Sequence, residues 1–343
     1  MTNEVSNRFG PLGLRRTVAL VAVVALLVVT AGCLGILSSS DDRSAQADVV
    51  PADADFLVHV DMGVLTDGEA QQLFETASEE DMSEGFDDMD EALAEIEDEF
   101  GLDPRAVDNV LVFGSMAADL EYGGAVVDTS WDVEDVVSAI EADEGIEYEL
   151  TEHAGQDVLY EPTEVSTLGD PLYVGELEDG QLVFGDEHAV TGALDVSYDG
   201  ADALSGPVRD AFDDSPSGYV TFAAGTPDEL VPGADPMADD DPMAGGDPMM
   251  GGGMGDLGEI EAVAGAIYTS SGNVGIEARA IFSDSSTAGE MAEMIEGVLP
   301  MLAMDDPELA EQLDKLDVST SGSALVVTFE TPVDELFELE DEF

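Results

Sequence analysis

The charge imbalance of the chain constrains its fold more than any other feature. Asp and Glu number 79 and Lys and Arg number 8, so the formal net charge is −71 over 343 residues. Repulsion among so many carboxylates opposes a compact state in dilute solution. At about 1 M salt the Debye length falls to about 3 Å, and most of this repulsion is screened. Because 44% of the residues are hydrophobic, the composition predicts a folded protein that works in concentrated salt rather than a disordered one.

The composition also limits the partners and the chemistry of the chain. A surface dominated by carboxylates repels the phosphates of nucleic acids, so no nucleic-acid partner is expected. The same surface is expected to bind cations diffusely. Cys33 is the single cysteine, so no disulfide can form within the chain.

The N-terminus has the parts of an export signal. Arg15 and Arg16 precede an uncharged apolar stretch at 17–32, and small residues lead directly to Cys33. This ending is similar to a lipoprotein box, in which the cysteine is lipidated and becomes the mature N-terminus. The arginine pair is similar to a twin-arginine export signal. We therefore expect a signal peptide at 1–32, a lipid on Cys33 and a folded part on the extracytoplasmic face of the membrane.

An uncleaved membrane helix is the alternative to a lipid anchor. Residues 17–37 are uncharged, and their length is close to the ~20 residues that span a bilayer. Both alternatives place residues 38–343 outside the membrane. Together with the acidic composition, the signal region resembles haloarchaeal surface lipoproteins that carry a twin-arginine-type signal peptide. The resemblance implies export and anchoring and names no activity.

Hydrophobic periodicity in the exported part predicts both strands and helices. The first strand, at 56–62, alternates, with His59 and Asp61 on the side away from its apolar face. A set of three strands, a helix and a β-hairpin is expected twice. In the first copy these elements fall at 56–62, 110–116, 124–128, 129–142 and 146–161, and in the second at 219–224, 263–269, 274–282, 285–303 and 316–330. The sequence therefore predicts an internal duplication.

This pattern predicts an α+β fold with two similar lobes, each a mostly antiparallel sheet with helices on one face. The first lobe is expected at 51–215 and the second at 216–343. Residues 33–50, which begin with the lipidated cysteine, show no periodicity and are expected to be a polar tether.

Segment 226–258 differs from the rest of the second lobe. It is rich in Gly, Pro, Met and Asp and repeats Asp-Pro-Met three times at a period of six residues. Such a density of Pro and Gly is typical of a flexible loop. Its methionines are soft ligands of the kind that hold Cu(I), but the segment contains no His or Cys, so a plain linker is favoured.

No motif in the chain identifies a catalytic or metal-binding residue. The three histidines, His59, His153 and His188, show no metal-ligand spacing and are expected at surface or half-buried structural positions. Acidic runs such as 239–241 lack the spacing of a Ca²⁺-binding loop. We therefore expect no catalytic residue, no cofactor and no metal ligand. A pair of catalytic carboxylates would nevertheless leave no trace in so acidic a sequence.

The leading hypothesis for function is a non-catalytic binding or structural module of the cell envelope, anchored through Cys33 and partnered by an envelope protein. An extracytoplasmic hydrolase that uses carboxylate acid–base catalysis is one alternative. A metal- or solute-binding receptor is another. The sequence identifies no ligand.

The charge balance generates a prediction about stability. The exported part should unfold as salt is removed, because the repulsion among its carboxylates is then no longer screened. Far-ultraviolet circular dichroism of the purified protein, recorded at molar salt and in dilute buffer, measures this loss. A spectrum that stays the same in dilute buffer would contradict the prediction.

Overall fold

The computed structural model describes residues 40–66, 89–117, 120–164, 171–177, 180–226, 260–270, 273–302, 307–313 and 315–332. Arg15, Arg16 and Cys33 lie outside the described residues, as does nearly all of segment 226–258. The expectations about export, lipidation and that segment therefore stay predictions.

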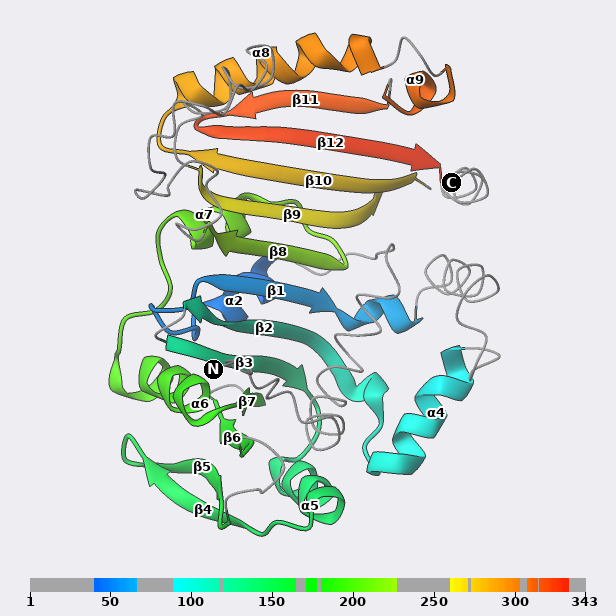
Figure 1. Ribbon diagram of the computed structural model, residues 1–343. Helices are drawn as coiled ribbons and strands as arrows, with labels where there is room; N and C mark the ends of the chain where they lie inside the picture. Colours follow the sequence, from blue (N-terminus) through cyan, green and yellow to red (C-terminus); the bar gives the residue numbers. More distant parts are fainter. Residues whose placement is uncertain are drawn as a thin grey trace, which may run out of the picture.

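The strands form one antiparallel sheet (Figure 1). In the described part of the chain twelve strands follow the order β11-β12-β10-β9-β8-β1-β2-β3-β7-β6-β5-β4, and the α+β class is confirmed. Their bounds are β1 (Phe56–Asp61), β2 (Val107–Ala117), β3 (Leu120–Thr129), β4 (Tyr148–His153), β5 (Gln156–Pro162), β6 (Tyr173–Glu176), β7 (Gln181–Gly185), β8 (Val220–Gly225), β9 (Ile260–Ser270), β10 (Asn273–Phe282), β11 (Leu316–Ser321) and β12 (Ala324–Pro332).

The strands of both expected lobes lie in this single sheet. β1 pairs with β2 on one side and with β8 on the other, so Phe56 lies opposite both Gly114 and Ala224. The β6–β7 hairpin is inserted between β3 and β5. Its position depends on pairing between segments far apart in the chain, which local periodicity does not indicate.

Helices lie on both faces of the sheet. Their bounds are α2 (Ser40–Ala47), α4 (Met89–Phe100), α5 (Val133–Glu144), α6 (Glu187–Leu194), α7 (Pro207–Asp214), α8 (Ser285–Leu302) and α9 (Pro307–Leu313). On the first face, which carries Leu57, the strands share a core cluster with Ala189 of α6 and Phe212 of α7. On the second face, which carries Val60, the cluster includes Leu93 of α4 and Val136 of α5.

The strand register places α8 on the second face as well. Phe56, which alternates with Leu57 along β1, lies opposite Ala224, and the row continues through β9 to Ala280 and Leu325. Leu325 packs in one cluster with residues of α8, with Ala280 against it. Since directly opposed residues share a face, α8 covers the same face as α4 and α5.

The expectation that the helices cover one face is therefore wrong. The alternation of the first strand put His59 and Asp61 on its polar side, but that side is buried, with 0% of His59 and 7% of Asp61 exposed. Polar residues under a helix produced the same sequence pattern as polar residues facing water. The helix that explains this is α2.

Residues 40–50 are not the expected polar tether, because they contain α2 and pack into the fold. Arg43 of α2 is 1% exposed. Its Nη1 donates to Thr221 Oγ1 at 3.1 Å and to the Pro216 carbonyl at 3.2 Å. Its Nη2 donates to the carbonyls of Ser215 and Asp213 at 3.1 and 3.3 Å. The guanidinium also lies 5.0 Å from the centre of the Phe212 ring, within cation–π range.

A second arginine strengthens the same joint between α2 and α7. Arg209 of α7 donates from Nη2 to the Ser44 carbonyl at 3.1 Å and pairs with the Asp48 carboxylate at 3.0 Å. Beyond Cys33 the chain has only five basic residues, and two of them fix α2. The joint therefore concentrates the scarce cationic side chains of this protein.

Aspartate, which the composition supplies in excess, caps the starts of α5, α6 and α8. Asp132 and Asp186 accept backbone N–H groups at the starts of α5 and α6. At the start of α8 the Asp284 carboxylate accepts the N–H groups of Ser286 and Thr287. Hydrogen bonds from these two residues lower the pKa of Asp284 to about 2. Each cap satisfies N–H groups that the first turn leaves unpaired.

In the described ranges, no helix combines the length and the apolar character that a membrane crossing requires.

The α2 joint generates a prediction about stability. Arg43→Met should lower the free energy of unfolding by about 2–4 kcal/mol, because it leaves buried acceptors without a donor. Urea unfolding at molar salt measures the change. The matched control is Arg105→Met, which removes a partly exposed arginine 3.8 Å from Asp103 and should cost less than about 1 kcal/mol. Equal losses in the two variants would contradict a special role for Arg43.

Candidate functional site

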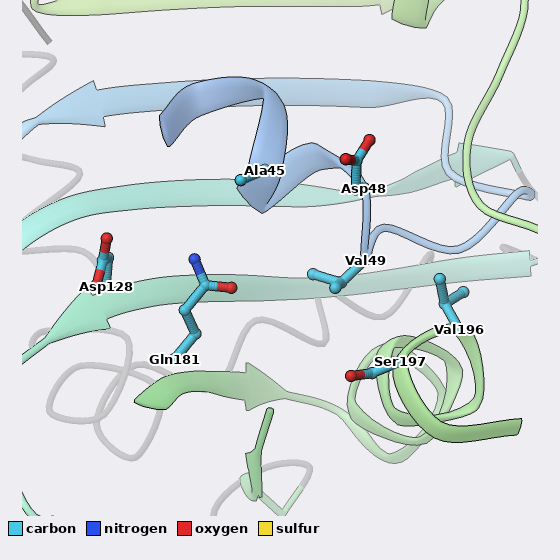
Figure 2. Close-up of a pocket in the computed structure, with 7 residues that line it drawn as sticks. All are labelled: Ala45, Asp48, Val49, Asp128, Gln181, Val196 and Ser197. Atoms are coloured by element: carbon cyan, nitrogen blue, oxygen red, sulfur yellow. The ribbon is translucent and has the colours of Figure 1, made fainter. Parts of the chain in front are cut away.

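A pocket opens on the first face of the sheet, beside the C-terminal end of α2 (Figure 2). Its volume is about 390 Å³, and it is lined by Ala45, Asp48, Val49, Asp128, Gln181, Val196 and Ser197. Figure 2 shows the side chains of Asp128 and Gln181 projecting on the same side from neighbouring strands. Val196 and Ser197 come from the π-helical turn after α6 (Asp195–Asp199). The polar lining offers oxygen ligands and no cationic side chain.

Two lining residues of the pocket continue into a row of polar side chains that crosses four strands. Asp61 of β1 lies opposite Asn109 of β2, Asn109 lies opposite Asp128 of β3, and Asp128 lies opposite Gln181 of β7. We call these four residues the polar row. Directly opposed side chains lie about 5 Å apart, so the row forms one continuous strip on the first face.

Gln46 of α2 lies over the buried end of the polar row. It is 0% exposed, and Asn109 and Asp61 are 6% and 7% exposed. Gln46 Nε2 donates to the carbonyls of Asn109 and Val126 at 3.3 and 3.5 Å. The Oε1 of Gln46 and the Oδ1 of Asn109 are buried and have no hydrogen-bond partner within the protein. One buried acceptor oxygen without a protein partner therefore comes from α2 and one from β2.

A second polar cluster joins residues 51–55 to the start of α6. His188 Nε2 lies 2.9 Å from Asp53 Oδ2, and the Tyr122 hydroxyl donates to Asp53 Oδ1 at 2.9 Å. Burial would raise the pKa of Asp53, but the hydrogen bonds from His188 and Tyr122 outweigh it and the pKa lies below its ordinary value. Burial and the Asp53 carboxylate raise the pKa of Tyr122. The Asp53 carboxylate therefore bridges Tyr122 of β3 and His188 of α6.

The histidines occupy three different environments. His59 is fully buried, which differs from the expected surface or half-buried position. His153 Nε2 lies 2.8 Å from Asp195, and the side chain of His188 is 48% exposed. Within the described ranges, no group of three or more His, Cys, Asp or Glu residues is placed to hold a metal ion.

The second face has a wide apolar surface at its centre. In Figure 1 α8 lies beside β11 at one end of the sheet, and α4 and α5 lie toward the other end. The helices near the central strands, α2 and α7, pack in the core of the first face. We call the residues of this surface the open apolar face: Val58 of β1, Val220 and Phe222 of β8, Ile267 of β9, and Ile276 and Ala278 of β10. Phe222 and Ile276 are 38% and 37% exposed. At its margin α8 exposes Met294, Val298 and Met301 by 42%, 44% and 67%.

The open apolar face belongs to three cross-strand rows that contain no charged residue. The rows run across β2, β1, β8, β9, β10, β12 and β11 as Gly114–Phe56–Ala224–Val263–Ala280–Leu325–Thr320, Val112–Val58–Phe222–Gly265–Ala278–Val327–Val318 and Val110–Val60–Val220–Ile267–Ile276–Phe329–Leu316. Gly265 is required here, because a Cβ would lie 2.7 Å from a ring carbon of Phe222. The Phe222 ring therefore packs closely over the backbone of the neighbouring strand β9.

The sequence analysis did not predict the polar row, and it did not predict that the open apolar face is exposed. The signal for the row was a polar residue near one end of each of several largely apolar strands, such as Asn109 in Val107–Ala117. Gln181 joins the other three residues only because β7 pairs with β3, which the order of elements along the chain does not reveal. The apolar side of the first strand was predicted, but its exposure was not.

Comparisons with known proteins add little to this geometry. No protein-family model and no curated protein matches the chain. Crystal forms III, IV and I of the protein TP0453 are similar in structure, with TM-scores of 0.42, 0.43 and 0.40 and sequence identities of 12%, 11% and 11%. The matches cover 87%, 87% and 86% of this chain and 98%, 96% and 96% of those chains.

Proposed function

We propose that the protein is a lipid-anchored, extracytoplasmic and non-catalytic binding module of the cell envelope, and that a protein partner docks on the open apolar face. The observation that carries the proposal is that face itself. About a quarter of all residues are charged, yet three rows across seven strands hold no charge. A contiguous exposed apolar patch marks an interaction site.

The shape of the face favours a protein over a small solute. The exposed part extends across β1, β8, β9 and β10, and strands about 4.8 Å apart make that width about 15 Å before side chains are added. A small apolar ligand is normally enclosed in a concave pocket. A broad surface built on sheet positions suits a partner with its own apolar patch.

The position of α2 favours a partner other than the membrane that holds the anchor. α2 begins seven residues after Cys33, so an extended linker would span at most about 25 Å. α2 packs on the first face, with Arg43 buried there, whereas the open apolar face is on the second. The sheet therefore lies between the anchored helix and the proposed docking surface.

We also propose that the sheet arose by internal duplication. β1, β2, β3, α5, β4 and β5 give the order 1-2-3-5-4, once the β6–β7 hairpin is set aside, and β8, β9, β10, α8, β11 and β12 give the same order. α5 and α8 both lie on the second face, as equivalent connections would. An experimental structure in which the two sets of five strands fail to superpose would contradict duplication.

The docking proposal predicts the effect of a charge on the open apolar face. Ile276→Glu should remove most partner capture, because a carboxylate at a desolvated contact costs several kcal/mol unless it is paired. Crosslinking in intact cells at native salt, followed by affinity capture, measures this.

The matched control is Ser319→Glu, which adds the same charge at an exposed position of β11 whose opposed residue, Val326, lies on the first face. The control should keep the partner. A partner retained by Ile276→Glu, or lost equally in both variants, would overturn the assignment. Recovery of lipid alone, or of a second copy of this chain alone, would replace the proposed protein partner.

A further inference from the structure

We propose that the buried end of the polar row is a Ca²⁺ site, with the carboxylates of Asp61 and Asp128 and the amide oxygens of Asn109 and Gln46 as ligands. The inference goes beyond the proposed docking function and concerns the opposite face of the sheet. It also differs from the expectation that the chain has no metal ligand.

The unpartnered amide oxygens carry the argument. Gln46 Nε2 donates to two backbone carbonyls, which accept only, so the orientation of this amide is fixed and Oε1 must be the second atom. That Oε1 and the Oδ1 of Asn109 are buried without a hydrogen-bond partner in the protein. In native structures, most buried polar atoms have at least one hydrogen-bond partner. A bound cation satisfies two acceptor oxygens without requiring a donor from the protein.

The geometry of the row allows one ion to reach both carboxylates. Asp61 and Asp128 flank Asn109 on the two neighbouring strands, so their backbones are separated by about 10 Å. Asp61 Oδ1 accepts the Gly63 N–H at 2.8 Å, a hydrogen bond that a carboxylate can keep while it binds a cation. If the two carboxylates lean toward Asn109, roughly 5 Å separates their nearest oxygens, about twice the Ca²⁺–oxygen distance of about 2.4 Å. An ion above Asn109 would then lie under α2, where the Gln46 amide crosses β2 and β3.

The chemistry of these ligands selects the ion. Carboxylate and amide oxygens are hard ligands that suit Ca²⁺, Mg²⁺ and Mn²⁺ rather than Cu or Zn. Two carboxylates balance a divalent charge. Ca²⁺ accepts irregular shells of six to eight oxygens, whereas Mg²⁺ needs a near-ideal octahedron. Among the described residues, no group of three or more His, Cys, Asp or Glu is placed to hold an ion. The amide oxygens of Asn109 and Gln46 are therefore essential ligands in this proposal.

The pocket beside α2 provides the route to the site. Asp128 and Gln181 belong to both the polar row and the pocket lining (Figure 2). An ion entering there would pass from the open end of the row to its buried end. Once bound, it would join α2 to strands β1, β2 and β3 and so fix the helix that follows the anchor.

The experiment is a calcium titration of the purified protein at constant molar KCl after removal of divalent ions with a chelator. The thermal midpoint should rise with Ca²⁺ and saturate. Asp128→Asn should raise the half-saturating Ca²⁺ concentration at least about tenfold, because it removes one of two charged ligands. The matched control is Asp108→Asn, which removes the same charge from an exposed position of β2 and should leave the half-saturating concentration unchanged.

A third variant separates an ion from a buried water. Asn109→Asp adds a charged ligand of the same shape, so it should lower the midpoint in chelator and lower the half-saturating Ca²⁺ concentration. Failure of Ca²⁺ to rescue this variant would show a bound water only and overturn the proposal. A midpoint that rises without saturation, or equally with Mg²⁺, would show diffuse screening and also overturn it. None of these outcomes depends on the open apolar face.

Discussion

The docking of α2 on the first face is the interaction on which the rest of the structure depends. It buries a guanidinium that lies against a ring and four oxygens, with three of those oxygens on backbone carbonyls. Burial lowers the pKa of Arg43, and the nearby Asp213 carboxylate opposes that shift. A buried positive charge is costly in most proteins. The nearby Asp213 carboxylate offsets part of that cost, and burial of the guanidinium protects this short-range attraction from screening by salt.

The two faces of the sheet show how an acidic composition is distributed. The first face buries the polar residues His59 and Asn109, together with Gln46 of α2, which donates to the Asn109 carbonyl. The second face keeps apolar residues at its centre and exposes part of them, including Phe222 and Ile276. Outside the polar row, aspartates such as Asp132, Asp186 and Asp284 lie at helix starts, where they accept backbone N–H groups. Side chains of the open apolar face pack against neighbouring strands, as the close approach of the Phe222 ring to Gly265 shows.

Local pattern predicted much of the fold but little of the candidate site. The alternation at 56–62 and the strands at 219–224 and 274–282 correspond closely to β1, β8 and β10, because period-two hydrophobicity is a local property. The polar row requires β3 to pair with β7 and β1 with β2, which joins residues separated by a whole helix and hairpin. Burial also cannot be inferred from polarity alone, since His59 is polar and fully buried. The prediction of a polar tether was wrong at 40–47 for the same reason, because polar residues there, such as Arg43 and Gln46, contact the protein rather than water.

Position links α2, the polar row and the open apolar face. α2 crosses β2 and β3 through Gln46 and reaches β8 through the bond from Arg43 to Thr221. β8 and β1 are also the strands that present Phe222 and Val58 on the opposite face. One layer of strands, with no intervening helix, therefore separates the two surfaces. Because side chains on a strand alternate between faces, a shift of β1 against β8 would move both surfaces together. The contacts of α2 fix the register of the central strands from one side, and the register in turn fixes the apolar rows on the other.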